Sequence, residues 1–347
     1  MIKNYKLLIL ILTLVISGCN RNQKSKKQIS EKANSSIEIK VDDRIELFRL
    51  AYNLAIMDSI SPDLRPCKDK FYSENYLPYK KYSNHPFVQK IAKGDLWNGD
   101  LPVLALALNK NLKPKSNLDK SQLENQFGWY GKNIDSVSRL ISNFKETINF
   151  RNEYDINFIP LKDSIKTNKI TQKLNNFFRV EKQPNLIIYF DPLNNITSRS
   201  ITFLPENDSI RKYLLANICE KSDSIDLNKS LTPKWNKTNR RITFHENSHL
   251  YTEDLFHRYY TDEFDEKLKS DKFKNERTNI DEIIVRGITA KIIALNYGKK
   301  IGDFEYDRLW PKSKIVFKEL DNYVKNKNMT FEEIYKVIIT KLEESYS

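Results

Sequence analysis

The sequence predicts an α+β protein that is predominantly helical. Two observations support this prediction. Apolar residues recur at helical period over several long stretches, and two short runs of β-branched and aromatic residues follow each other in mid-chain. Only 8 glycines occur in 347 residues, without a phosphate-binding Gly-rich loop or an internal repeat. From about residue 42 the chain is long enough for one large domain or two lobes.

The first 19 residues have the pattern of a bacterial lipoprotein signal peptide. Two lysines precede an apolar run over residues 7–16, which is too short to span a membrane. The sequence Ile-Ser-Gly-Cys that follows resembles a lipobox, with cleavage before Cys19 and lipid on its thiol; a plain secretory signal is the alternative. Asn20 stands where an inner-membrane retention signal has Asp. We therefore expect a lipoprotein of the bacterial cell envelope, with the outer membrane favoured.

Residues 20–41 are polar and rich in Lys, Asn and Ser, which predicts a flexible tether. The net charge of +13 is spread along the chain without a basic stripe interleaved with aromatic residues, so no nucleic-acid partner is expected. Cys67 and Cys219 remain in the exported part. They can form a disulfide or can both be buried free thiols, and the sequence does not decide between these two possibilities.

The expected elements fall into a helical N-terminal region over 42–180 and a second region over 181–347. Helical patterning in the first region covers residues 42–57, 79–93, 101–109 and 134–150. The second region begins with strands over 185–190 and 199–204, separated by turn-rich residues 191–198. Next come a helix over about 239–260 capped by Thr238 or Asn239, a charged loop over 261–279, an apolar helix over 279–295, and helices over 313–325 and 330–344.

Residues 245–249 read His-Glu-Asn-Ser-His, an HExxH motif, in a chain with only 4 histidines. Positions four apart lie on the same face of a helix, so His245 and His249 can bind one metal ion. Glu246 stands beside the first histidine, where a carboxylate can accept a proton from a metal-activated water. The alternative is a chance occurrence of the pattern.

Two histidines leave a catalytic zinc site incomplete, because such a site has three protein ligands and one open position. The longer pattern HExxHxxGxxH is excluded, since positions 252 and 255 are Thr and Leu. His257 lies two turns beyond His249 on the same helix, about 12 Å away, and is too distant to share the metal. Glu253 and Asp254 meet the same objection less severely. The third ligand is therefore expected from a second helix.

The best candidate for the third ligand is Glu282 on the apolar helix over 279–295. A carboxylate on a buried helix needs a partner, and a metal is one. Asn279 and Glu282 also fit a capping box, in which the glutamate bonds the Asn279 backbone instead. Asp281 and Glu276 are further options.

An HExxH motif followed some thirty residues later by a helix with a lone glutamate resembles the gluzincin group of zinc metallopeptidases. More narrowly, the chain resembles an uncharacterised family of secreted bacterial metallopeptidases. The segments that carry this likeness are residues 42–50, 84–88, 101–108 and the motif with 282–287. The resemblance implies a zincin-like fold with His245, His249 and Glu282 as Zn²⁺ ligands and Glu246 as the base. Asn and Ser replace the aromatic-plus-small pair typical of the motif interior, which bears on the substrate rather than on the metal.

We therefore expect a membrane-anchored zinc metallopeptidase that hydrolyses peptides or proteins, with Glu246 as general base. The edge of the small sheet can pair with an extended substrate. Arg286, one turn after Glu282, can orient that carboxylate, hold a substrate carboxylate, or form an ordinary ion pair. Arg286, Tyr297 and Tyr306 are the candidates for oxyanion stabilisation. The alternatives are an inactive zincin-fold binding lipoprotein and a structural lipoprotein without metal; the intact Glu246 favours the enzyme.

Overall fold

The structure is a computed structural model. It describes residues 36–56, 74–94, 96–150, 156–181, 185–194, 197–201, 210–216, 233, 235–269 and 279–346. The predicted signal peptide, Cys19 and the tether up to residue 35 lie outside the described residues, as do Cys67, Cys219 and Glu276. Residues 36–347 form one compact unit, and only this unit is described below.

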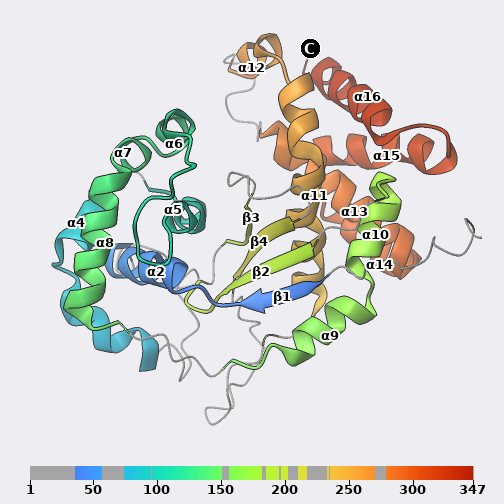
Figure 1. The fold of residues 1–347 in the computed structure, drawn as a ribbon. Coiled ribbons are helices and arrows are strands. Elements are labelled where there is room, and N and C mark those ends of the chain that lie inside the picture. Colours follow the sequence, from blue (N-terminus) through green and yellow to red (C-terminus); the bar gives the residue numbers. More distant parts are fainter. Residues whose placement is uncertain are drawn as a thin grey trace, which may run out of the picture. The chain divides into compact units, whose positions relative to one another are not determined.

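The predicted predominance of helices is confirmed, with one small mixed sheet in the middle of the unit (Figure 1). The described helices before the sheet are α2 (Asp43–Ile56), η2 (Leu77–Tyr82), α4 (Pro86–Ala92), η3 (Asn98–Asp100), α5 (Leu101–Ala107), α6 (Lys120–Phe127), α7 (Trp129–Lys132), α8 (Ile134–Ile148), α9 (Ile159–Thr167) and α10 (Ile170–Phe178). After the sheet come α11 (Lys237–Tyr259), α12 (Asp262–Leu268), α13 (Ile280–Tyr297), α14 (Lys299–Asp307), α15 (Pro311–Lys325) and α16 (Phe331–Glu344).

The sheet has four described strands in the order β1-β2-β4-β3, namely β1 (Ile37–Lys40), β2 (Asn185–Asp191), β4 (Ile210–Ala216) and β3 (Arg199–Ser200). β1, β2 and β4 run parallel, and β3 is antiparallel to β4 at one edge. The predicted strand over 185–190 is confirmed. The predicted strand over 199–204 is present at Arg199–Ser200, and residues 202–204 lie outside the described residues.

β1 corrects the predicted tether over 20–41, because its last residues belong to the sheet. Ile37 pairs with Leu186 of β2, and its side chain is buried. Ile39 lies two residues on, on the same face of the strand, and packs against the same apolar cluster. A four-residue strand in a polar segment gives little local signal, since its stability comes from a partner far along the sequence.

The two faces of the sheet contact two different apolar clusters. Tyr189 and Leu214 belong to the first cluster, with the side chains of α2, α4, α5 and α8. Ile188 and Tyr213 belong to the second cluster, with α10, α11, α13, α15 and α16. This division follows from the alternation of side chains along a strand. The sheet therefore separates the helices before residue 150 from the C-terminal helices.

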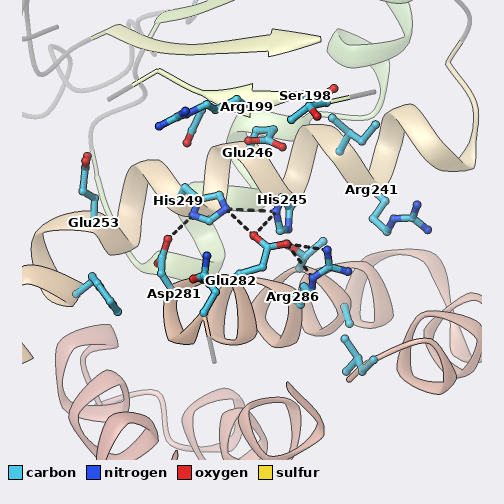
Figure 2. A pocket seen from close by; sticks show the side chains of 18 of the residues that line it. Ser198, Arg199, Arg241, His245, Glu246, His249, Glu253, Asp281, Glu282 and Arg286 are labelled. Carbon is cyan, nitrogen blue, oxygen red and sulfur yellow. Dashed lines mark hydrogen bonds and ion pairs between the residues drawn. The ribbon is translucent and has the colours of Figure 1, made fainter. Parts of the chain in front are cut away.

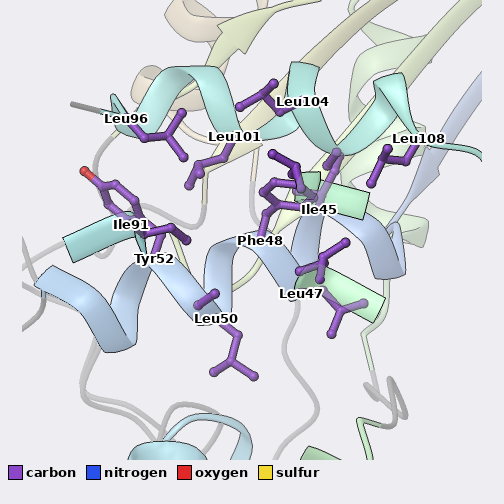
Figure 3. Packing of buried hydrophobic residues seen from close by; sticks show 14 of the residues in the cluster. Ile45, Leu47, Phe48, Leu50, Tyr52, Ile91, Leu96, Leu101, Leu104 and Leu108 are labelled. Carbon is purple, nitrogen blue, oxygen red and sulfur yellow. The ribbon is translucent and has the colours of Figure 1, made fainter. Parts of the chain in front are cut away.

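The first cluster is built around α2 and α5 (Figure 3). Phe48 of α2 is fully buried and meets Phe87 of α4 edge to face, with ring centroids 5.5 Å apart. All seven residues of α5 are buried, which explains why this helix is apolar on every side. Helices predicted over 42–57, 101–109 and 134–150 are confirmed here as α2, α5 and α8. The segment predicted as one helix over 79–93 divides into η2 and α4.

α9 and α10 pack with the second cluster, although both lie inside the predicted N-terminal region over 42–180. Ile165 and Leu174 are buried there, and α10 contacts both α11 and α13. The predicted boundary at residue 180 therefore does not coincide with the boundary between the clusters. None of the helices in the described part of the chain is both long and apolar enough to cross a bilayer.

Two local features differ from the predictions. The charged segment over 261–279 contains α12, which is capped by Thr261 and is fixed by the buried side chains of Phe264 and Leu268. The second difference is the cap of α11, which is Asn236 rather than Thr238 or Asn239. The Asn236 side chain accepts a hydrogen bond from the backbone amide of residue 239, and the helix begins two residues earlier than predicted.

A buried ion pair joins the first group of helices to the sheet. Arg49 of α2 donates from Nε to Oδ2 of Asp191 at the end of β2, at 2.8 Å, and both side chains are almost completely shielded from solvent. The same guanidinium also donates to the Asn98 side chain. A buried pair of this kind fixes the relative position of two elements, because neither charge can be left alone.

Candidate metal centre

α11 and α13 pack side by side and carry the predicted metal ligands (Figure 2). His245 and His249 lie one turn apart on the same face of α11, with their ring centroids 4.8 Å apart. Glu282 lies in the first turn of α13 and points its carboxylate at both imidazoles. Within the described residues, these three side chains form a group that could bind a metal ion.

The spacing of the three donor atoms fits a tetrahedral metal site. The two Nε2 atoms are 3.3 Å apart, and Oε2 of Glu282 lies 3.3 Å from His245 Nε2 and 3.5 Å from His249 Nε2. With metal–ligand bonds of 2.0–2.2 Å, the edge of a tetrahedron is roughly 3.3–3.6 Å. All three edges agree with this value, so the chain supplies one nearly regular face of such a site.

The capping alternative for Glu282 is present only in part. The Asn279 side chain accepts a hydrogen bond from the Glu282 backbone amide at 3.1 Å and so caps α13. The Glu282 carboxylate, however, does not turn back to the Asn279 backbone. Its Oε2 faces the histidines, and its Oε1 accepts bonds from Arg286 Nε at 2.8 Å and Nη2 at 2.7 Å. The backbone amide of Glu282 therefore takes part in the helix cap, while its side chain faces the two histidines.

Asp281 occupies a supporting position rather than the ligand position that the sequence left open for it. Its Oδ2 lies 2.8 Å from Nδ1 of His249, on the side of the ring opposite to the donor face. A carboxylate at this nitrogen holds the proton on Nδ1 and directs Nε2 towards the metal. Of the two acidic residues at the start of α13, Glu282 therefore belongs to the possible ligand group, and Asp281 contacts one of its histidines.

His249 and Glu282 shift each other's pKa values strongly. Burial alone lowers the pKa of His249, but its hydrogen bonds to Asp281 and Glu282 raise it to about 10. Burial alone would raise the pKa of Glu282, whereas the bonds from His245 and His249 hold it far below its usual range. The Glu282 carboxylate is therefore ionised and held facing the imidazoles.

Glu246 lies on the side of the imidazoles that faces β3, while Glu282 approaches them from α13 (Figure 2). Its side chain is buried, and burial raises its pKa, against the opposing effect of the two neighbouring histidines. Within the described residues Glu246 is not part of the ligand group. A buried carboxylate beside the donor atoms, but outside the ligand set, is placed as a proton acceptor.

A cleft of about 760 Å³ opens beside the metal ligands. Arg199 and Ser200 of β3 line it together with Ser198 just before the strand, and Trp97, which precedes η3, and Gln126 of α6 line it as well. The Arg199 Nη1 atom bonds Asp100 Oδ1 at 2.5 Å, which ties this edge of the sheet to the same helices. A chain of several residues can enter a cleft of this size.

The remaining sequence candidates are placed differently. Of the three residues expected to stabilise an oxyanion, only Arg286 lines the cleft; Tyr297 packs on Phe244 and Tyr306 packs on Phe317. His257 and Glu253 also line the cleft but lie outside the ligand group.

Among the residues of the cleft wall that sequence analysis missed are Arg241, Glu305, Arg308 and Trp97. Arg241 could have been found, because it stands four residues before His245 and shares its face of α11. The other three residues come from distant segments and give no local signal.

Comparisons with models of protein families, with curated proteins and with solved structures found no match to this chain.

The ligand set can be tested at Glu282. We expect Glu282→Gln to weaken metal binding by roughly 10-fold or more, because a charged ligand becomes a neutral amide. A residue that acted only as a cap would tolerate Gln well. The measurement is a competitive titration of the metal-loaded protein with a chromogenic chelator, with metal content determined by elemental analysis. Unchanged affinity, or full metal content in His245→Ala, would show that the ligand set is different.

Proposed function

We propose that the protein is a zinc metallopeptidase. The observation that carries this proposal is the group of His245, His249 and Glu282 beside an open cleft, with the buried carboxylate of Glu246 next to it. Two imidazoles and one carboxylate, with one position left open, are the ligand set of catalytic zinc in peptidases. A structural zinc site would close the fourth position with another protein ligand, and the described residues offer none there.

The proposed mechanism assigns each residue a separate task. When bound, Zn²⁺ supplies a Lewis acid that acidifies water and polarises a carbonyl group. Glu246 accepts the proton of the attacking water and delivers it to the amine that leaves when the peptide bond breaks. Its burial favours the first of these steps, because a carboxylate that is not stabilised by solvent takes up a proton more readily. Asp281 holds His249 in the required tautomer, and Arg286 fixes the carboxylate of Glu282.

The fold around the site supports a zincin-like arrangement of the gluzincin type. The HExxH helix α11 packs beneath the sheet and contacts both β3 and β4. Among the described strands, β3 is the antiparallel edge strand and borders the cleft, and in this proposal an extended peptide lies along it. Glu282, the third ligand in this proposal, lies on α13, in agreement with the gluzincin resemblance.

A direct test uses the metal-loaded protein with a broad peptide library and a denatured protein mixture. Cleavage that stops after chelation and returns with stoichiometric zinc supports the proposal. The second candidate is a zincin-fold lipoprotein that binds without turnover, and its prediction is bound zinc with no cleavage of any peptide. The buried Glu246, which a binding protein does not need, favours the enzyme.

We also propose that lipid on Cys19 anchors the protein in the cell envelope, since residues 16–19 resemble a lipobox. We expect Cys19→Ser to release the protein from the membrane fraction or to leave an unprocessed precursor. Fractionation of cells with mass spectrometry of the N-terminal peptide is the measurement. Cys67→Ser is the matched control and should remain in the membrane fraction. Wild-type protein without acyl groups in the soluble fraction would contradict the anchor.

A further inference from the structure

The cleft has a strongly basic wall on one side of the metal ligands. α11 and α13 run in opposite directions, so Arg241 and Arg286 both lie on the same side of His245 and Glu282 (Figure 2). Arg308, just after α14, also lines the cleft and lies close enough to Arg241 to repel it. We call Arg241, Arg286 and Arg308 the arginine group.

The positive charge of the arginine group is only partly balanced within the protein. Within the part of the chain that the structure describes, Arg241 and Arg308 make no hydrogen bond and no ion pair. Glu305 lies close enough to attract Arg241. Burial and the repulsion from Arg308 and Arg286 nevertheless lower the pKa of Arg241. Glu305 is itself buried, and its Oε1 has no hydrogen-bond partner. Glu305 therefore attracts Arg241, while Arg308 and Arg286 add positive charge around the same side chain, and Glu282 is shared between Arg286 and the metal ligands.

Arg286 differs from the other two because it is held in place. Its Nε and Nη2 bond Glu282, and its guanidinium lies over the ring of Trp310, 4.1 Å from the ring centroid. Stacking on an aromatic face and a two-atom contact with a carboxylate fix the plane of this group. Within the described residues, neither Arg241 nor Arg308 makes a hydrogen bond or an ion pair. A fixed cation beside these two is suited to bind an anion of the substrate.

We propose that the arginine group binds a carboxylate of the peptide substrate and so places the neighbouring peptide bond at the metal centre. This inference deepens the proposed function and rests on it for the peptide nature of the substrate. Arginine prefers planar, two-oxygen partners, which a carboxylate provides. The carboxylate can be the free C-terminus or an acidic side chain, and the experiment distinguishes these two sources.

The first arm measures binding without turnover. The full-length, metal-loaded Glu246→Gln variant is titrated by calorimetry with N-acetylated tetraalanine and with its C-terminal amide. A second pair of probes is an amidated alanine peptide with one internal glutamate and the same peptide with glutamine. We expect the acid of at least one pair to bind roughly 10-fold or more tightly than its neutral partner. The pair that discriminates identifies the source of the carboxylate.

The second arm assigns this preference to the arginine group rather than to the metal. In the same background, Arg241→Gln and Arg308→Gln are expected to reduce the acid-to-neutral ratio towards 1, and Arg241→Lys should retain part of it. A carboxylate bound by the metal would keep its preference in all three variants. Arg258→Gln is the matched control, because Arg258 also lies on α11 but pairs with Glu332, and it should leave the ratio unchanged. Thermal unfolding checks that each variant is folded, and Arg308 is exposed enough to be replaced without disturbing the core.

The outcomes separate this inference from the proposed function. Equal binding of acid and neutral probes, or a preference that survives both Arg→Gln changes, overturns the inference even where the wild type cleaves peptides. An acid preference that depends on Arg241 supports the inference even where the wild type cleaves nothing. That second result would overturn the peptidase and leave a carboxylate-binding cleft.

Discussion

Replacing Glu246 by glutamine is expected to lower peptide hydrolysis by about 10² to 10⁴ while the protein stays folded and keeps its metal. Glu246 lies beside the ligands without belonging to the ligand group, so its removal leaves all three donor atoms in place. Glutamine fills the same buried volume but cannot accept and return a proton. The loss should therefore appear in the rate constant for turnover, with substrate affinity nearly unchanged.

The measurement compares initial rates and metal content for Glu246→Gln and for Asp254→Asn. Asp254 is an exposed acid on the same helix, so its variant should match the wild type. A Glu246→Gln protein that retains most of the activity would remove the general base from the mechanism. Loss of metal together with activity would instead make Glu246 a ligand and contradict the assignment of Glu282.

The second large effect is expected at the buried pair of Arg49 and Asp191. Arg49→Met should lower the free energy of unfolding by about 3–5 kcal/mol, because the Asp191 carboxylate is left buried without its partner. Burial already raises the pKa of Asp191 beside Arg49, and removal of the guanidinium raises it further. The folded variant then binds this proton more tightly than the unfolded chain does. Its unfolding free energy should therefore fall as the pH rises from about 4 towards neutrality.

Chemical denaturation at several pH values tests this prediction. The double variant Arg49→Met/Asp191→Leu should regain much of the lost stability, since both charges are removed together. Arg258→Met, which breaks an exposed pair with Glu332, is expected to change the unfolding free energy by only about 0–1 kcal/mol. A small effect of Arg49→Met at neutral pH would mean that water reaches Asp191.

The sequence was most informative where a residue's role depends on near neighbours. The HExxH spacing predicted that the two histidines share one face of a helix, because positions four apart lie about one helical turn apart. From the sequence, Glu282 was compatible with both a cap and a ligand. Only the packing of α13 against α11 shows that its backbone amide takes part in the cap while its side chain faces the histidines. The basic wall and Trp97 could not be predicted as parts of one cleft, since they meet only in the folded chain.

Short elements with weak local patterns were also difficult to predict from the sequence. β2 was predicted from its apolar run, but β1 consists of four residues at the end of a polar segment and pairs with a partner almost 150 positions away. α12 was missed because its many charges obscured Phe264 and Leu268, which are four residues apart and both buried. Apolar patterns as short as those of β1 and α12 do not predict an element reliably unless the surface that buries them is known.

α13 contacts α15 as well as α11, and Gly287 makes the contact with α15 close. A Cβ atom at this position would lie 2.6 Å from the Val316 side chain and 2.8 Å from the backbone oxygen of Ser313. Any larger residue would push α13 away from α15 and towards α11, and Glu282 would move with it. The tolerance of a metal site is a few tenths of an ångström. The position of Glu282 therefore depends on a helix that supplies none of the three donor atoms. We expect substitutions on α15 to change metal affinity from a distance.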